Sequence, residues 1–87
     1  MVKVWRVQGF NSSEKIFERD MPGDLSEAEI STVLQRLVCR HLSPDEIIRA
    51  SLRKGDPDYI VHLERMGTGR PIEFGYDPHY TAELKEK

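Results

Sequence analysis

Three things are scarce in this sequence of 87 residues: cysteine, tryptophan and an excess of charge of one sign. The single cysteine, Cys39, cannot form an internal disulfide, which is typical of a protein kept in a reducing cytoplasm. Thirteen basic residues nearly balance fifteen acidic ones, for a formal net charge of −2. That balance argues against a like-charged disordered tail and against a strongly cationic protein of the ribosomal type. No apolar run is long enough for a membrane span or a signal peptide, so we expect a cytoplasmic protein without a membrane partner.

The length of the chain allows one domain. Hydrophobic residues make up 38% of the sequence and charged residues 32%, which fits a small soluble globular domain with a small core. We assign residues 1–80 to that domain. Residues 81–87 are expected to form a short C-terminal tail or a frayed helical turn.

The first part of the chain predicts a β-hairpin. Residues 2–7 are rich in β-branched and aromatic side chains, which favours a strand. Gly9 and the polar residues 11–13 follow with the composition of a turn. Residues 15–19 then predict a second, shorter strand that ends before the Pro22-Gly23 pair.

Two successive capping boxes predict two helices. Ser26 is followed at the third position by Glu29, and Ser43 by Glu46. In each box the serine side chain accepts from a free backbone N–H while the glutamate reaches back to the serine N–H. We expect a first helix of about four turns and a second that ends near Gly55, joined by a tight corner. The inward stripes are Ile30, Val33, Leu34, Leu37, Val38 and His41 in the first helix, and Ile47, Ile48, Ser51 and Leu52 in the second.

The last part of the chain predicts a second hairpin. Apolar residues alternate with polar ones over residues 59–64 and again over residues 72–76, with a glycine-rich loop at 67–71 between them. The fold class is therefore α+β, in the order ββααββ. Two β-hairpins form an antiparallel sheet that flanks a central pair of α-helices in a single small domain. The predicted core faces of this hairpin are Tyr59, Val61 and Leu63, and Ile72, Phe74 and Tyr76.

The residues that usually carry catalysis or bind metal are not clustered in the sequence. His41, His62 and His79 are widely spaced and form no local ligand pair, and zinc needs three or four ligands. Cys39 has no histidine placed beside it as a base. The loop containing Gly67 lacks the lysine of a P-loop and the third glycine of a dinucleotide site. We therefore predict a protein that is not an enzyme and that uses neither a metal nor a cofactor.

Basic residues around the two predicted helices favour one binding function. A tight helical corner followed by a glycine-containing hairpin resembles the winged helix-turn-helix, in which cations neutralise phosphates and the second helix enters a DNA groove. The net negative charge and the short second helix argue against it. Nucleic-acid binding is thus kept as the alternative function. The residues that would carry it are Arg36, Arg40, Arg49, Arg53, Lys54 and Arg70.

A protein-interaction or assembly module is the function we predict first. Trp5, Phe10 and Phe17 lie in the first hairpin, and alternation directs only one side of that hairpin into a shared core. An aromatic residue left on the other side would suit a partner protein or a second copy of the chain. We select Trp5 as the candidate anchor, and a homodimer formed through the sheet is a further expectation.

Overall fold

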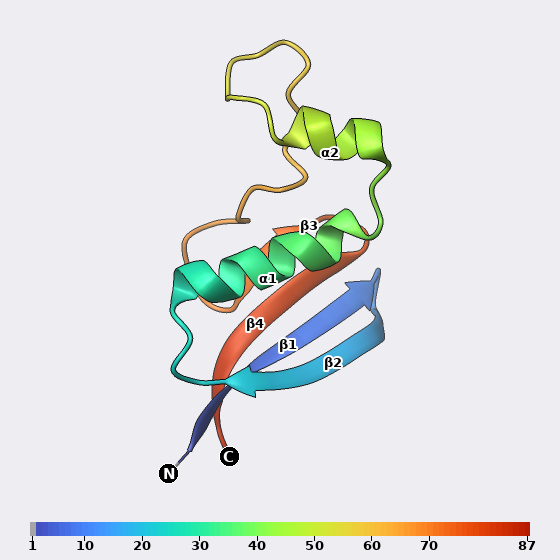
Figure 1. Ribbon diagram of the computed structural model, residues 1–87. Coiled ribbons are helices and arrows are strands. Elements are labelled where there is room, and N and C mark those ends of the chain that lie inside the picture. The colour runs from blue at the N-terminus through green and yellow to red at the C-terminus, as the bar shows by residue number, and fades with distance from the viewer. Residues whose placement is uncertain (1) are drawn as a thin grey trace.

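A computed structural model describes residues 2–87 as an antiparallel sheet with both helices on one side of it (Figure 1). The expected ββααββ order is confirmed. The elements are β1 (Lys3–Asn11), β2 (Glu14–Pro22), α1 (Glu27–Cys39), α2 (Pro44–Ala50), β3 (Ile72–Gly75) and β4 (His79–Glu86).

The four strands form one sheet in the order β2-β1-β4-β3, and every neighbouring pair is antiparallel. The first and last strands of the chain therefore lie side by side at its centre. Their register runs from Lys3 opposite Glu86 to Phe10 opposite His79. Strands β2 and β3 are the two edges.

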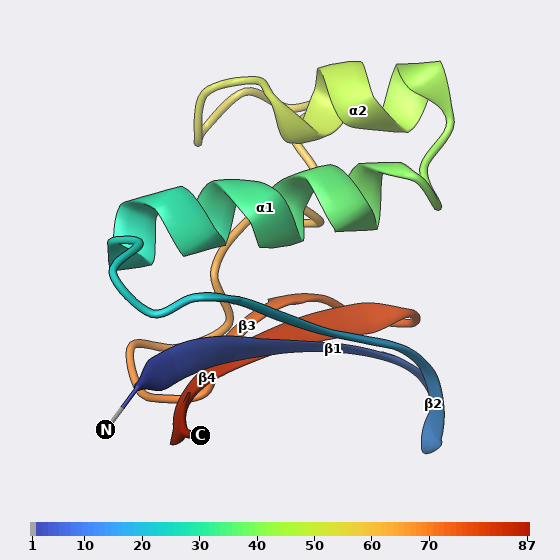
Figure 2. The same cartoon turned by 60° about the horizontal axis from the view of Figure 1, so that its bottom comes forward.

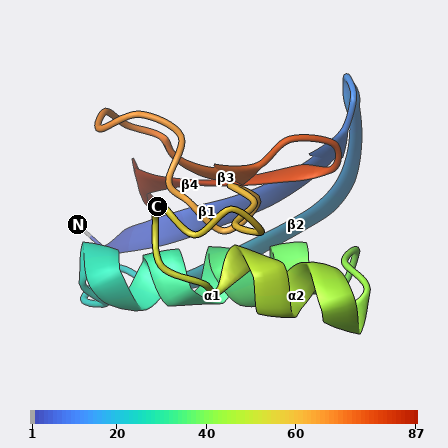
Figure 3. The ribbon, with the colours of Figure 1, turned by 90° about the horizontal axis from the view of Figure 1, so that it is seen from above.

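The molecule has three layers, which Figure 2 shows from the side. Helix α1 packs on the sheet, where it contacts β3 and β4, and α2 lies on the far side of α1 from the sheet. The expectation that a helical pair covers the sheet is thus correct only for α1. From α2 the chain follows an irregular path through residues 51–71 and returns to the sheet at β3 (Figure 3).

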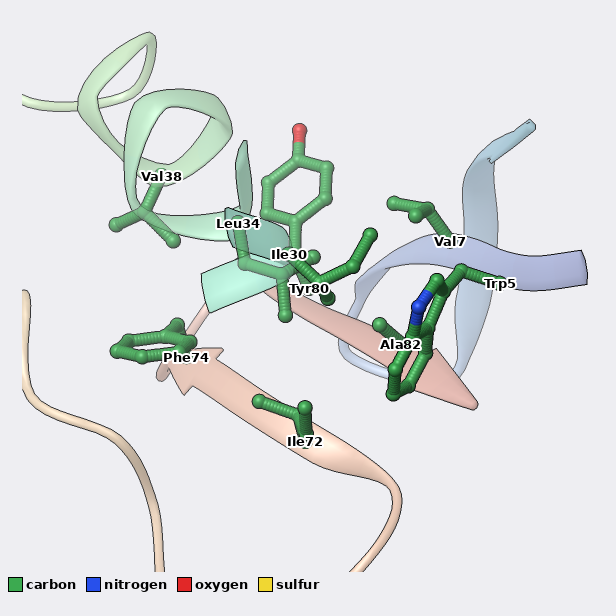
Figure 4. Close-up of a cluster of buried hydrophobic side chains, with 9 residues drawn as sticks. All are labelled: Trp5, Val7, Ile30, Leu34, Val38, Ile72, Phe74, Tyr80 and Ala82. Carbon is green, nitrogen blue, oxygen red and sulfur yellow. The ribbon is translucent and has the colours of Figure 1, made fainter. Parts of the chain in front are cut away.

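The core lies between α1 and the inner face of the sheet. It collects the apolar stripe of the helix and the alternate residues of three strands, which Figure 4 shows converging. Burying a side chain such as Leu34 or Ile72 completely stabilises the fold by about 1.5–3 kcal/mol each. The buried cluster is Trp5, Val7, Ile30, Leu34, Val38, Ile72, Phe74, Tyr80 and Ala82.

Both predicted capping boxes are present. Ser26 and Ser43 are the N-caps, and in each case the serine and the glutamate three residues later exchange hydrogen bonds. Helix α2 is shorter than predicted, because it ends at Ala50 after seven residues. Gly55 has a left-handed φ of +96° but lies beyond the helix. Ile48, expected to face inward, is 63% exposed because no other layer covers that side of α2.

The predicted second hairpin is wrong in its pairing. Residues 59–64 form no strand, and β3 pairs with β4 instead. The expected tail at residues 81–87 belongs mostly to β4, which lies at the centre of the sheet. Ile72 and Phe74 are buried as predicted, whereas Val61 is 40% and Tyr76 49% exposed. Within residues 2–87, neither helix has the length and hydrophobicity needed to cross a bilayer.

Candidate interaction face and corner pocket

Strand β2 has an inner face that α1 leaves partly open. The register places Phe17 opposite Gly9, Arg19 opposite Val7 and Met21 opposite Trp5. These three β2 residues therefore share the side of the sheet that carries the core. Phe17 and Met21 are half-buried against the core cluster, while Arg19 between them is exposed.

One side of α1 faces this open part of the sheet. The opposite side is occupied, because Gln35 Nε2 donates to the Leu63 carbonyl at 2.8 Å and Glu27 pairs with Arg65 and Arg70. The helical rotation of about 100° per residue sets a second group of residues around the other side of the helix, away from these contacts. That group consists of Val33, Arg36, Leu37 and Arg40, of which Val33 and Leu37 are half-buried and both arginines are exposed.

We call the two groups together the basic flank: Phe17, Arg19 and Met21 of β2 with Val33, Arg36 and Leu37 of α1 and its C-cap residue Arg40. Tyr80 connects its two sides at the sheet. The Phe17 and Tyr80 rings meet edge to face with their centroids 6.1 Å apart. Arg40 is near enough to the Tyr80 hydroxyl to favour its ionised form, although burial is the larger effect and raises the Tyr80 pKa.

The three arginines of the basic flank carry charge that the rest of the chain does not neutralise. Among the described residues 2–87, Arg19, Arg36 and Arg40 have no carboxylate oxygen within 4.0 Å. Other cations are paired, for example Arg6 with Asp20 at 2.9 Å. An exposed guanidinium next to half-buried apolar side chains presents both a charge and an apolar surface to a ligand.

The structure separates the basic residues that the sequence had grouped. Arg36 and Arg40 lie one helical turn apart, at the end of α1 and at its C-cap. Arg49 Nε donates to the Asp58 carbonyl at 3.0 Å, and Lys54 pairs with Glu64 at 2.6 Å, so both stabilise the 51–71 segment. Arg53 is exposed and lies three residues beyond the end of α2. The predicted helical corner is therefore not one continuous basic surface.

Arg70 lies at another end of the molecule, beside Trp5. Its guanidinium hydrogen-bonds Glu27, and its Cζ atom lies 5.6 Å from the centroid of the Trp5 ring. Across the glycine-rich loop before it, the predicted hairpin is reduced to a single antiparallel bridge between Arg65 and Phe74, with the Met66 N–H donating to the Glu73 carbonyl at 2.8 Å. Residues 59–64 form no strand, so the wing expected in the winged-helix hypothesis is not formed as a strand pair.

Trp5 is part of the core and not a surface anchor. It is 1% exposed, and its Nε1 donates to the Leu25 carbonyl at 2.9 Å. The alternation of β1 instead directs Phe10 to the opposite, open face of the sheet, where its ring stacks on His79 at 5.4 Å. Of the three aromatic residues in the first hairpin, Phe17 is the one on the basic flank.

Arg19 is the residue that sequence reasoning missed. The sequence contains a pattern that could have indicated Arg19. Side chains of a strand point alternately to its two faces, so Phe17, Arg19 and Met21 share one face of β2. Once the side of β1 that carries Trp5 and Val7 is known to be the core side, this alternation puts Arg19 there as well. The sequence alone does not show that α1 leaves this edge open.

A second feature is a cavity of about 190 Å³, which we call the corner pocket. It lies where the end of α1, the start of α2 and the β3–β4 turn meet, with one side chain from the 51–71 segment. Its lining combines an apolar part with two imidazoles, a phenol and two carboxylates. The residues are Val38, His41, Leu42, Glu46, His62, Gly75, Tyr76, Asp77 and Pro78.

The polar groups of the corner pocket are held in place by the fold. His41 Nε2 and the Tyr80 hydroxyl share a hydrogen bond of 2.7 Å. Hydrogen bonds from Ser43 hold the pKa of Glu46 below its usual range, with smaller contributions from His62 and Arg49. Asp77 Oδ1 accepts from the Ser12 N–H at 2.8 Å. These contacts keep Glu46 ionised and fix the carboxylates as a charged rim, an arrangement that suits binding.

Residues 2–87 contain no group of three or more His, Cys, Asp or Glu side chains placed to hold one ion. Comparison of the chain with protein-family models, with curated proteins and with solved structures found no match.

Proposed function

We propose that this chain is a non-enzymatic protein-interaction module whose basic flank binds an acidic, amphipathic segment of a partner protein. The observation that carries the proposal is the position of Arg19, Arg36 and Arg40 around half-buried apolar side chains: all three are exposed and have no ion pair with a carboxylate of residues 2–87. A partner with carboxylates beside an apolar stripe would complement both features of this surface.

The apolar part of the basic flank supplies the second requirement of a protein interface. Phe17 and Leu37 pack against the core on one side and are incompletely covered on the other. A partner residue that covers them removes further apolar surface from water, which stabilises a complex by about 25 cal/mol per Å² before the costs of association. Arginine and aromatic residues are also the types enriched where binding energy concentrates.

Several observations favour a protein partner over a nucleic acid. A nucleic-acid site would be expected to use a longer row of cations over a more polar surface. Here Arg49 and Lys54 make contacts within the chain, and the net charge is −2. Helix α2 has only seven residues, which leaves little length for reading a groove. Nucleic-acid binding is therefore an outcome that the experiment distinguishes.

Self-association through the sheet is not part of this proposal. The exposed edge is β2, which is charged at five of its nine positions and ends at Pro22. Charged residues and proline on an edge strand are the features that usually prevent pairing with a second sheet.

The test is a titration of ¹⁵N-labelled protein with a synthetic amphipathic peptide that has leucines at helical spacing and glutamates elsewhere. We expect shifts at residues 17–21 and 33–40 that weaken as salt is added. Arg36→Glu combined with Arg40→Glu should lower the affinity about tenfold or more, since two attractive contacts become repulsive.

Two controls make the test specific. Arg53→Glu reverses an exposed charge outside the basic flank and should leave the affinity unchanged. A peptide with lysine in place of every glutamate should not bind. The proposal is refuted if the acidic peptide gives no shifts, or if the double variant binds it as tightly as the wild type. Salt-sensitive shifts with a mixed-sequence DNA duplex, and none with the peptide, would establish the alternative function instead.

A further inference from the structure

The corner pocket has a charge opposite to that of the basic flank. Its lining includes two carboxylates, Glu46 and Asp77, and neither lysine nor arginine. Because the two surfaces differ in sign and in residues, what binds at one is chemically distinct from what binds at the other. Ligand binding in the corner pocket is therefore independent of the proposed function of the basic flank.

Each of the two carboxylates has one oxygen engaged by the fold. Glu46 Oε1 accepts from the Ser43 N–H at 2.9 Å, which completes the capping box of α2. Asp77 Oδ1 accepts from the Ser12 N–H at 2.8 Å. Within residues 2–87, the second oxygen of neither carboxylate receives a side-chain or backbone donor. Two fixed carboxylates with an acceptor remaining on each are suited to a ligand that carries several N–H donors.

The remaining walls favour a cation on an apolar stem. Val38, Leu42 and Pro78 supply apolar surface, and the His62 and Tyr76 rings meet edge to face with centroids 5.6 Å apart. The face of an aromatic ring attracts a cation, and the apolar surface accommodates methylene groups. A small neutral or anionic ligand would leave the carboxylates uncompensated.

The size of the pocket suits a small ligand. Its volume of about 190 Å³ accommodates a short alkyl chain with one ammonium group, whereas a nucleotide is larger than this space. Gly75 helps to preserve it, because a Cβ there would lie 2.8 Å from the Pro78 carbonyl oxygen and 3.1 Å from Val38.

We infer that the corner pocket binds a primary alkylammonium group, with Glu46 and Asp77 as the acceptors for its N–H donors and Tyr76 as an aromatic wall. Such a group is found both in free amines and in lysine side chains. The chemistry of recognition is the same in both, so the experiment has an arm for each source.

The first measurement is an NMR titration of the wild-type protein with n-butylammonium chloride at pH 8. We expect saturable shifts at Gly75 and at the Val38 methyl groups. The uncharged n-butanol, of nearly the same size, should bind about tenfold more weakly or not at all. A pentapeptide with one lysine between glycines forms the second arm. Binding of both the amine and the peptide indicates a side-chain site, and binding of the amine alone indicates a site for free amines.

Variants then test the acceptors. Glu46→Gln combined with Asp77→Asn removes both charges but keeps an oxygen for Ser43 and for Ser12, and should weaken butylammonium binding at least about tenfold. Asp45→Asn is the matched control, because Asp45 is adjacent in sequence and does not line the pocket. The Asp45→Asn variant should bind butylammonium with the same affinity as the wild type.

The wild-type titrations keep the inference testable even if the double variant does not fold. Equal affinity for butanol and butylammonium would overturn it, because the carboxylates would then contribute nothing. Absence of saturable shifts, or shifts spread over the acidic residues of the whole surface, would overturn it as well. In a folded double variant, unchanged affinity for butylammonium would show that Glu46 and Asp77 are not the acceptors.

Discussion

Gly9 lies on β1 directly opposite Tyr80 of β4, and the substitution Gly9→Ala tests whether this close approach holds the core together. A Cβ at position 9 would meet the Tyr80 Cδ2 atom at 2.8 Å and would come still closer to Cε2. Carbon atoms in contact are normally about 3.5–4.0 Å apart, so the ring must move by roughly 1 Å or β1 must shift. Tyr80 is 3% exposed and lies against the Phe17 and His41 rings, which leaves no room for that movement.

The expected loss of stability follows from these contacts. Overpacking a core typically costs 1–3 kcal/mol, and the required displacement places Gly9→Ala at the upper end. Moving the Tyr80 ring also breaks its hydrogen bond to His41, which contributes about 1 kcal/mol. We therefore expect a loss of about 4 kcal/mol, equivalent to a fall in Tm of roughly 15–30 °C in a domain of this size. Urea unfolding followed by the fluorescence of the only tryptophan measures it.

Gly69→Ala is the matched control, because a Cβ at Gly69 meets nothing within 4 Å. Its stability should stay within about 0.5 kcal/mol of the wild type. A smaller residue at position 80 should relieve the clash, so Gly9→Ala and Tyr80→Val should be less destabilising together than the sum of the two, by about 1 kcal/mol or more. Additive effects in this cycle, or a loss for Gly9→Ala no larger than that of the control, would refute the reasoning.

Two further predictions concern the core and its acidic contacts. Trp5→Ala should cost about 3–5 kcal/mol of unfolding free energy, because it removes a buried ring, and sedimentation should show no change in the association state. The Arg70 guanidinium, with help from Arg65, lowers the pKa of the Glu27 carboxyl. A carboxyl group with a lowered folded pKa contributes stability above its unfolded pKa of about 4, and that contribution is lost as the pH falls. Glu27→Gln should therefore reduce stability at pH 7 and make it fall less steeply on acidification in urea titrations at each pH; an unchanged acid profile would show that the pair does not stabilise the fold.

The parts of the fold that could be predicted from the sequence are those fixed by neighbours along the chain. A capping box is complete within four residues, so Ser26 and Ser43 identify the starts of both helices without knowledge of the tertiary structure. The apolar stripe of α1 likewise predicts correctly that Ile30, Leu34 and Val38 are core residues. Each of these predictions depends on backbone hydrogen bonds or on helical period, which act locally.

Strand pairing could not be predicted in the same way, because it depends on a partner far along the chain. Residues 59–64 alternate like a strand but have no partner, and they remain irregular. Strand β4 also alternates, with Tyr80, Ala82 and Leu84 on one side. Its alanine, two glutamates and one lysine favour a helix, however, and the central position of β4 in the sheet overrides that preference. The basic flank was only half predictable for the same reason, since Arg19 joins Arg36 and Arg40 through tertiary packing alone.

The central pairing of β1 with β4 has a consequence for the order in which this chain can fold. These strands lie far apart in the sequence. Bringing them together costs conformational entropy of the long loop between them before their contacts can stabilise the fold. Helix α1 contacts β3 and β4, so its apolar stripe also has no lasting partner until the final strand is available. Until β4 has emerged from the ribosome, the edge of β1 that pairs with β4 in the folded domain has no partner strand. Strand β4 thus completes the core, and this domain is expected to fold only after β4 has emerged, not while β1, β2 and α1 are being synthesised.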